Sequence, residues 1–197
     1  MKYLLVGIGN VGEAYVHTRH NIGFDVLDAF AARHDMVFRP DRYADRAEGR
    51  WKGKQLILIK PTTYVNLSGK AVKYWMDKEK IPLEQLLVVV DDIALPLDTV
   101  RLRPGGSDGG HNGLKHIEEM LGTRQFARLR FGIGQHFPKG QQVEYVLGKW
   151  KPEEWEIVQK KISLCVDILE SFISRGIEAT MNDFNARKIK LENGSPS

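Results

Sequence analysis

Polar side chains follow the apolar runs of this sequence, and together they could carry out acid–base chemistry. They are Asn10 and His20 after residues 3–7, Tyr64 and Asn66 after 55–59, Asp91 and Asp92 after 86–90, and His111 and Asn112 in the glycine-rich segment 104–113. A histidine with a carboxylate at its far ring nitrogen is held in one tautomer and can take a proton from water. Neutral amides can donate hydrogen bonds to a carbonyl oxygen that is gaining negative charge. This combination favours hydrolysis of an activated acyl bond, with water as the nucleophile.

Nothing in the sequence indicates a covalent nucleophile or a metal site. No serine stands in a G-x-S-x-G turn, and Cys165 lies on an apolar helical stripe, where we expect it to pack in the core. The remaining four histidines show no ligand spacing with carboxylates or thiols: His17, His34, His116 and His136. We therefore expect no metal and no cofactor.

Each of these polar residues also has a purely structural interpretation. Asn10 and Asn112 stand beside glycines and could be turn residues, and Asn66 could cap a helix. A lone histidine such as His20 is more often a surface residue than a catalyst. The argument for a site is that all of them are expected at the carboxyl ends of strands.

Three glycines near the start of the chain form a tempting motif. Gly7, Gly9 and Gly12 spell G-x-G-x-x-G directly after an apolar run, the pattern of a dinucleotide-binding turn. In that turn the helix begins within the glycines, so that its first N–H groups face pyrophosphate. Here residues 13–21 show no apolar stripe, and helical spacing starts only near Ile22. A nicotinamide-dependent oxidoreductase is therefore the weaker alternative.

Strands and helices alternate along the chain. Apolar runs predict strands at 3–7, 55–59, 86–90 and 128–133, and apolar spacing of three to four predicts helices at 22–31, 68–78 and 114–121, with a last one from 152 to 172. This order predicts a single-domain α/β fold with a mixed, largely parallel twisted sheet and helices on both faces. We expect the domain to span residues 1–187 and the polar segment 188–197 to be a flexible tail.

The composition favours a globular protein with an anionic partner. Its 197 residues are 42% hydrophobic, enough for one domain with a core, and no apolar run reaches the roughly 18 residues of a membrane helix. The 29 basic residues outnumber the 25 acidic ones, so the net charge is +4 and nucleic acid is the first candidate partner. A single cysteine and the lack of secretion-signal features favour a cytoplasmic protein.

Four segments resemble bacterial peptidyl-tRNA hydrolase in their residues and in their order. They are Gly9–Gly12 (GNVG), Thr18–Gly23 (TRHNIG), Lys60–Gly69 (KPTTYVNLSG) and Gly105–Lys115 (GGSDGGHNGLK), and the likeness extends from Lys2 to about Arg187. Four blocks at consistent spacing are far more specific than the glycine motif. The resemblance implies cleavage of the ester between a peptide and the 3′ ribose of tRNA by a metal-free enzyme that is usually monomeric.

The resemblance also implies roles for particular residues. In this family the histidine that matches His20 is the general base, and the aspartate that matches Asp91 orients it. The implied binding residues are Asn10, Asn66 and Asn112 for the peptide backbone and the terminal adenosine, Tyr15 and Tyr64 for the walls of the cleft, and Arg103 and Arg130 for the 5′ phosphate of tRNA. Val65 stands where the family usually has Met, so we expect a shorter apolar wall there.

The implied substrate agrees with the residue types. A substrate that is half peptide and half nucleic acid needs amides at one end of a cleft and guanidinium groups at the other. We expect tRNA as the partner, in the form of peptidyl-tRNA, with no membrane and no obligate protein partner. A non-catalytic RNA-binding module is the main alternative, because it would share the basic charge without requiring His20 and Asp91 to meet.

Overall fold

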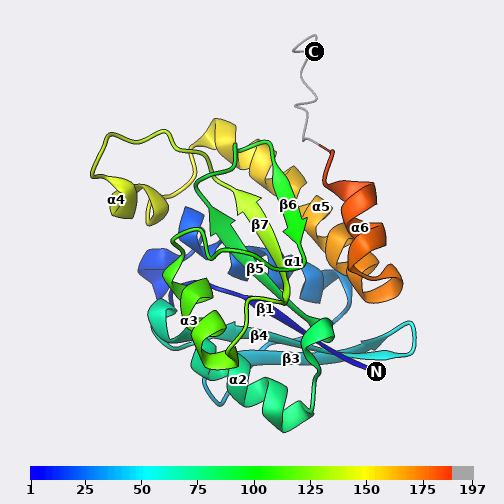
Figure 1. Ribbon diagram of the computed structural model, residues 1–197. Helices are drawn as coiled ribbons and strands as arrows, with labels where there is room; N and C mark the ends of the chain where they lie inside the picture. Colours follow the sequence, from blue (N-terminus) through cyan, green and yellow to red (C-terminus); the bar gives the residue numbers. More distant parts are fainter. Residues whose placement is uncertain (188–197) are drawn as a thin grey trace.

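Seven strands form a single sheet in the computed structural model of the chain, which describes residues 1–187 (Figure 1). The strands are β1 (Lys2–Gly7), β2 (Arg39–Asp41), β3 (Ala44–Trp51), β4 (Lys54–Pro61), β5 (Leu86–Asp92), β6 (Val100–Arg103) and β7 (Ala127–Gly132). Their order across the sheet is β2-β3-β4-β1-β5-β7-β6. The tail predicted at residues 188–197 lies outside the described residues.

The middle of the sheet is parallel. β1 pairs in parallel with β4 on one side and with β5 on the other, and β5 pairs in parallel with β7. Antiparallel strands complete both edges, with β3 and β2 beyond β4 and β6 beyond β7. The predicted mixed sheet is confirmed, but it is not largely parallel, because the strands at both edges pair in the antiparallel sense. The carboxyl ends of β1, β5 and β7 meet at one end of the sheet.

Helices cover both faces of the sheet (Figure 1). They are α1 (Ile22–Arg33), α2 (Ser68–Glu79), α3 (Asn112–Leu121), α4 (Gln142–Val146), α5 (Pro152–Arg175) and α6 (Ile177–Phe184). Leu87 and Val89 of β5 belong to the core with α1 and α5, whereas Leu86 and Val88 belong to the core with α2 and α3. β5 is therefore apolar on both faces, which explains its continuous apolar run.

Apolar periodicity does not reveal five of these elements: β2, β3, β6, α4 and α6. β3 alternates charged residues with small ones, and only Ala44 and Ala47 of its eight residues are buried. The helix predicted to be the last is in fact followed by α6. Gly176 separates the two helices with a φ of 86°, a conformation that ends α5 without a side-chain clash.

Two further predictions concern the core and membranes. Cys165 is fully buried in α5, and this burial raises the pKa of its thiol to about 12. The thiol therefore stays protonated near neutral pH and is no nucleophile. Among residues 1–187, no helix is long and apolar enough to cross a membrane.

Candidate active site

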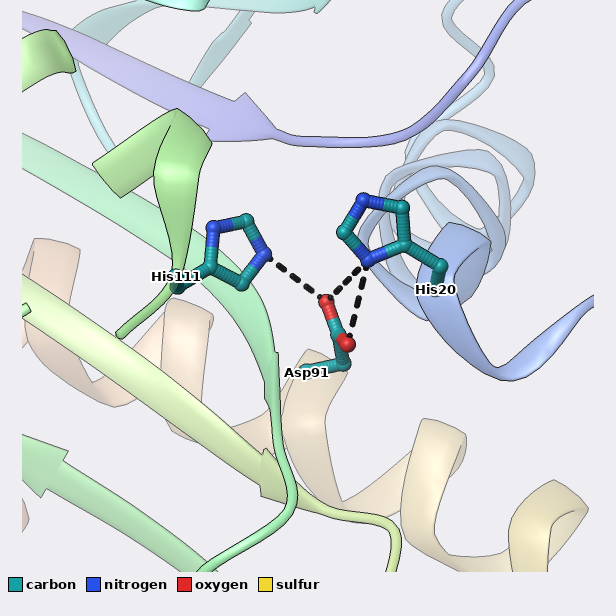
Figure 2. Close-up of side chains that lie close together, drawn as sticks. All are labelled: His20, Asp91 and His111. Atoms are coloured by element: carbon teal, nitrogen blue, oxygen red, sulfur yellow. Dashed lines mark hydrogen bonds and ion pairs between the residues drawn. The ribbon is translucent and has the colours of Figure 1, made fainter. Parts of the chain in front are cut away.

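The side chains of His20, Asp91 and His111 meet at the carboxyl end of the central strands (Figure 2). Nδ1 of His20 lies 3.0 Å from Oδ1 of Asp91 and 3.1 Å from Oδ2. From the other side, Nε2 of His111 lies 2.9 Å from Oδ1 of Asp91. The two imidazole centroids are 5.1 Å apart. The structure thus brings His20 and Asp91 together and adds a second histidine to the same carboxylate.

The hydrogen bonds assign a tautomer to each ring. Nδ1 of His111 accepts the N–H of Leu114 at 3.3 Å, so Nε2 carries the proton that is donated to Asp91. Nδ1 of His20 likewise donates to Asp91, because a carboxylate can only accept. Nε2 of His20 keeps its lone pair, and Figure 2 shows this nitrogen on the side of the ring away from Asp91. A histidine in this state can take a proton.

Burial and charge act in opposite directions on these groups. Asp91 is 6% exposed, and burial alone would raise its pKa, but the charges and hydrogen bonds of His20 and His111 keep that pKa well below its usual range. Burial lowers the pKa of His20, yet the charge of Asp91 and the hydrogen bond to it raise this pKa above the ordinary value. Asp91 is therefore ionised at neutral pH and makes His20 a stronger base.

An inner strand of the sheet, β5, places Asp91. β5 is paired on both sides, with β1 and β7, and Asp91 stands opposite Phe131 of β7. The neighbouring Asp92 does not contact the histidines but binds groups near the end of β5. Its Oδ1 accepts the N–H of Ala94 at 2.8 Å, and its Oδ2 lies 3.5 Å from Nη1 of Arg130. One carboxylate thus binds the histidines, while the next orders the turn after β5.

His20 is the middle residue of the 3-10 turn Arg19–Asn21, which leads into α1. The buried side chain of Asn21 binds both main-chain groups of Asn10. Oδ1 of Asn21 accepts the Asn10 N–H at 2.8 Å, and Nδ2 donates to the Asn10 carbonyl at 2.8 Å. Asn21 therefore ties the loop after β1 to the turn that carries His20.

Two glycines of the G-x-G-x-x-G motif, Gly7 and Gly9, allow close packing. A Cβ at Gly7 would lie 2.2 Å from the carbonyl oxygen of Gly23 in α1, and a Cβ at Gly9 would lie 2.9 Å from the side chain of Asn21. Because α1 begins only at Ile22, the α-helix does not start within the glycines as a dinucleotide-binding turn requires. The motif thus serves packing of β1 on α1, and the geometry offers no support for the oxidoreductase alternative.

A cleft of about 420 Å³ opens beside the two histidines. It is lined by most of the predicted site residues: Asn10, His20, Tyr64, Asn66, Asp91, Asn112 and Arg130. Tyr64 is 80% exposed, so its ring is free to contact a ligand. Tyr15 and Arg103 are not among the lining residues. Tyr15 ends the 3-10 turn Glu13–Tyr15, and Arg103 ends β6.

Helix α4 and the residue after it form another wall of the cleft. Their lining residues are Gln142, Val143, Val146 and Leu147. Sequence reasoning does not reveal this wall, because a helix of five residues is too short to show apolar periodicity. His111 is among the polar residues that the sequence places at the expected site, but the sequence gives it no role; its contact with Asp91 is seen only in the structure.

The two arginines predicted to bind phosphate share one face of the sheet. Arg130 of β7 lines the cleft, and its guanidinium contacts the carboxylate of Asp92 and donates to the carbonyl of Ser107. Arg101 of β6 stands opposite Arg130. Arg103 lies two residues further along β6 and so faces the same side. The pair is on one face, although only Arg130 reaches the cleft.

The cluster His20, Asp91 and His111 also has the composition of a metal site. One ligand atom from each residue lies within 4.8 Å of the others, and no other such group exists among residues 1–187. The ring nitrogens that face Asp91 are the protonated ones, so a metal would have to displace both protons. Hydrogen bonding to Asp91 is enough to account for the geometry.

Comparison with known proteins places the chain in a family. Residues 4–192 match the family model described as peptidyl-tRNA hydrolase. The chain is 55% identical over 187 residues to the peptidyl-tRNA hydrolase of Phocaeicola vulgatus, covering 95% of this chain and 100% of that protein. It is 53% identical over 185 residues to that of Porphyromonas gingivalis, covering 94% and 100%. The crystal structure of peptidyl-tRNA hydrolase from Acinetobacter baumannii is similar with a TM-score of 0.89 at 31% identity, covering 94% of this chain and 95% of that one. The chain therefore belongs to the peptidyl-tRNA hydrolase family.

Proposed function

We propose that the protein hydrolyses the ester bond between the peptide and the 3′ ribose of tRNA in peptidyl-tRNA, releasing peptide and free tRNA for recycling. One observation carries the reaction type: His20 binds Asp91 through Nδ1, keeps a lone pair on Nε2 and lines the cleft. Membership of the peptidyl-tRNA hydrolase family supports peptidyl-tRNA as the substrate.

Water is the nucleophile in the proposed reaction. Nε2 of His20 accepts a proton from the water while the water oxygen bonds to the ester carbonyl carbon. The imidazolium that forms is stabilised by the carboxylate of Asp91, which lies 3.0 Å from Nδ1. The tetrahedral adduct then releases the ribose 3′ oxygen, which takes the proton from Nε2. His20 thereby returns to its starting state.

Hydrogen-bond donors meet the negative charge that develops on the carbonyl oxygen. Asn10 and Asn112 line the cleft with His20 and carry side-chain amides suited to this role. Asn21 fixes the main chain of Asn10, and Asn112 begins α3 directly after His111. His111 binds Asp91 opposite His20, so we assign it a positioning role.

The remaining cleft residues suit the peptide and the terminal nucleoside. Asn66, with Asn10 and Asn112, can pair with main-chain amides of the peptide, and the exposed ring of Tyr64 can stack on a base. Aminoacyl-tRNA is spared in this scheme, because its free ammonium cannot make the contacts of a peptide amide. Tyr15 lies outside the cleft lining and is proposed to contact the substrate beyond it.

Arg103 and Arg130 are the proposed ligands of the tRNA 5′ phosphate. Guanidinium groups bind phosphate oxygens through paired N–H donors, and the net charge of +4 favours the same anionic partner. We expect the protein to act in the cytoplasm as a monomer, without an obligate protein partner, and as one domain over residues 1–187.

The test compares an N-blocked aminoacyl-tRNA with its unblocked counterpart. We expect the protein to cleave only the blocked ester, and His20→Ala protein serves as the inactive control. A non-catalytic RNA-binding module would bind tRNA and leave both esters intact. Equal cleavage of both would refute the requirement for a peptide amide.

A further inference from the structure

One buried arginine joins the turn that carries His20 to a wall of the cleft. Arg19 precedes His20 in the chain and is 5% exposed. Its main-chain N–H donates to the carbonyl of Gly148 at 3.0 Å, and the preceding Thr18 forms an isolated antiparallel bridge with Lys149. The backbone before His20 is therefore tied to the segment that follows α4.

The guanidinium of Arg19 is held by the same region. Nη1 donates to the carbonyl of Tyr145 at 3.2 Å, and Nη2 lies 2.9 Å from Oε1 of Glu154. The guanidinium carbon lies 4.3 Å from the ring centroid of Tyr145 and 5.4 Å from that of Trp150. A planar guanidinium can donate along its edge and stack on rings at once, which a lysine ammonium cannot do.

Helix α4 packs on the rest of the described chain through Tyr145 and the partly buried Val146. Tyr145 is the buried residue among its five, whereas Val143 is 65% exposed. Besides Arg19, Tyr145 contacts the carbonyl of Ile133 through its hydroxyl and the ring of Phe137, 4.9 Å between centroids. A helix this short is not stable by itself. The wall that α4 forms in the cleft therefore depends on how Tyr145 is held.

The buried ion pair of Arg19 and Glu154 fixes the orientation of the side chains, which apolar packing would not do. The side chains of Arg19 and Glu154 are only 7% and 13% exposed, and a buried ion pair is often no more stabilising than an apolar pair of the same volume. Hydrogen bonds, however, fix direction. Oε1 of Glu154 also accepts the N–H of Lys151 at 2.9 Å, so the same carboxylate joins Arg19 to the start of α5.

We infer that Arg19 is a positioning residue of the active site, which holds the α4 wall of the cleft in register with the turn that carries His20. The inference rests on the proposed function, because it takes His20 as the base and the cleft as the substrate site. Loss of the planar guanidinium should let the wall move and so raise KM. It should also lower kcat, because the backbone beside His20 moves with it.

The test is Arg19→Lys, with Arg46→Lys as the matched control. Arg46 has the same kind of surroundings at the far side of the sheet, with Nη2 3.1 Å from Oε1 of Glu79 and its guanidinium 5.0 Å from the ring of Trp75. With an N-blocked aminoacyl-tRNA as substrate, we expect Arg19→Lys to raise KM about fivefold or more and to lower kcat about tenfold, since small displacements in an active site are costly. We expect Arg46→Lys to leave both constants within about twofold, because it touches no cleft residue.

The value of KM separates positioning from simple loss of stability. Partial unfolding lowers the apparent kcat and leaves KM unchanged, so a wild-type KM in folded Arg19→Lys protein would overturn the inference. If Arg19→Lys does not fold, Glu154→Ala gives the same test against Glu79→Ala, because alanine removes the acceptor that Nη2 of Arg19 binds.

A second measurement does not depend on the proposed function. Amide hydrogen exchange of residues 142–148 should be faster in Arg19→Lys than in the wild type, and unchanged in Arg46→Lys. Unchanged exchange in Arg19→Lys would overturn the role of Arg19 even if the protein hydrolyses peptidyl-tRNA. If the wild-type protein cleaves no ester but exchange is faster in Arg19→Lys, the proposed function is refuted. The link between Arg19 and α4 is then still supported.

Discussion

At the scale of single residues, the chemistry depends on how one carboxylate is shared. Asp91 accepts from both His20 and His111, but the two rings differ in what their second nitrogen does. In His111 it accepts the N–H of Leu114 at the start of α3, whereas in His20 it keeps its lone pair beside the cleft. A single backbone N–H thus distinguishes His111 from His20, the proposed base.

Replacing the proposed base, His20, should stop the reaction without affecting tRNA binding. We expect His20→Ala to lower kcat by about 100-fold to 10,000-fold, the range that general-base catalysis contributes. Because the side chain of His20 makes hydrogen bonds only to Asp91 among the described residues, fold and tRNA affinity should stay close to those of the wild type. Release of the N-blocked amino acid measures the first effect and fluorescence anisotropy of labelled tRNA the second. Substantial turnover by the variant would remove His20 from the role of base.

Removing the carboxylate should shift the pH dependence of the reaction. In the wild type kcat/KM rises with pH as Nε2 of His20 loses its proton, and Asp91 raises the pKa of His20 against the effect of burial. In Asp91→Asn the negative charge is gone, and burial still lowers the pKa of His20. This pKa therefore falls, and the increase of kcat/KM with pH moves to lower pH. The plateau should also fall, because the imidazolium loses its partner. A pH–rate profile whose rise stays at the wild-type pH would show that Asp91 does not set the basicity of His20.

At the scale of elements, the close contact of α1 with the sheet places His20 near Asp91. Gly7 and Gly23 make this contact possible. A Cβ at Gly23 would lie 2.6 Å from the nitrogen of Ile8 and 2.7 Å from the carbonyl oxygen of Val89. Since the turn with His20 leads directly into α1, the separation of helix and strands also determines the distance from His20 to β5.

A methyl group between β1 and α1 should therefore reduce both stability and activity. We expect Gly7→Ala to lower the free energy of unfolding by about 1–3 kcal/mol, the usual cost of overpacking, because the new Cβ meets the main chain of Gly23. Urea unfolding and kcat/KM measure the two effects. Gly49→Ala is the control, since a Cβ there would meet only the flexible side chain of Met36 at 2.9 Å. Equal effects of both substitutions would contradict the importance of the β1–α1 contact.

At the scale of the whole molecule, the ends of the parallel strands bring two kinds of chemistry to one cleft. Asn10 follows β1 and Asn112 begins α3, and both lie beside His20. Arg130 reaches the same cleft from β7, next to the edge strand that carries Arg103. Amides suited to main-chain groups of a peptide and guanidinium groups suited to phosphate thus lie along one surface, as the proposed substrate would require.

The arginines should account for part of the salt dependence of tRNA binding. We expect the double substitution Arg103→Ala and Arg130→Ala to weaken binding and to reduce the slope of log K against log salt by about 1 for each phosphate that the variant no longer binds. Arg50→Ala is the control, because Arg50 is exposed on β3 near the opposite edge of the sheet. An unchanged slope in the double variant would contradict the proposed phosphate contacts.

The sequence by itself determined the elements with strong local signals and the residues that follow them. The apolar run of β5 predicts a buried strand with Asp91 at its end, and the late start of helical spacing predicts that α1 begins near Ile22. These features depend on neighbours in the chain, so periodicity and residue type are enough. Residue periodicity does not predict β3, because its buried positions are the small residues Ala44 and Ala47, which stand between charged ones.

The family resemblance already pairs His20 with Asp91, but only the tertiary structure decided how these residues meet and which other groups join them. His20 and Asp91 are separated by 71 positions, and their contact depends on α1 packing against β1 and β5. No local pattern encodes three other features of the site. They are the bond of His111 to Asp91, the wall that α4 forms in the cleft, and the link of that wall to Arg19. The physical reason is that the role of a polar group is set by the partners across from it in space, and those partners come from distant segments of the chain.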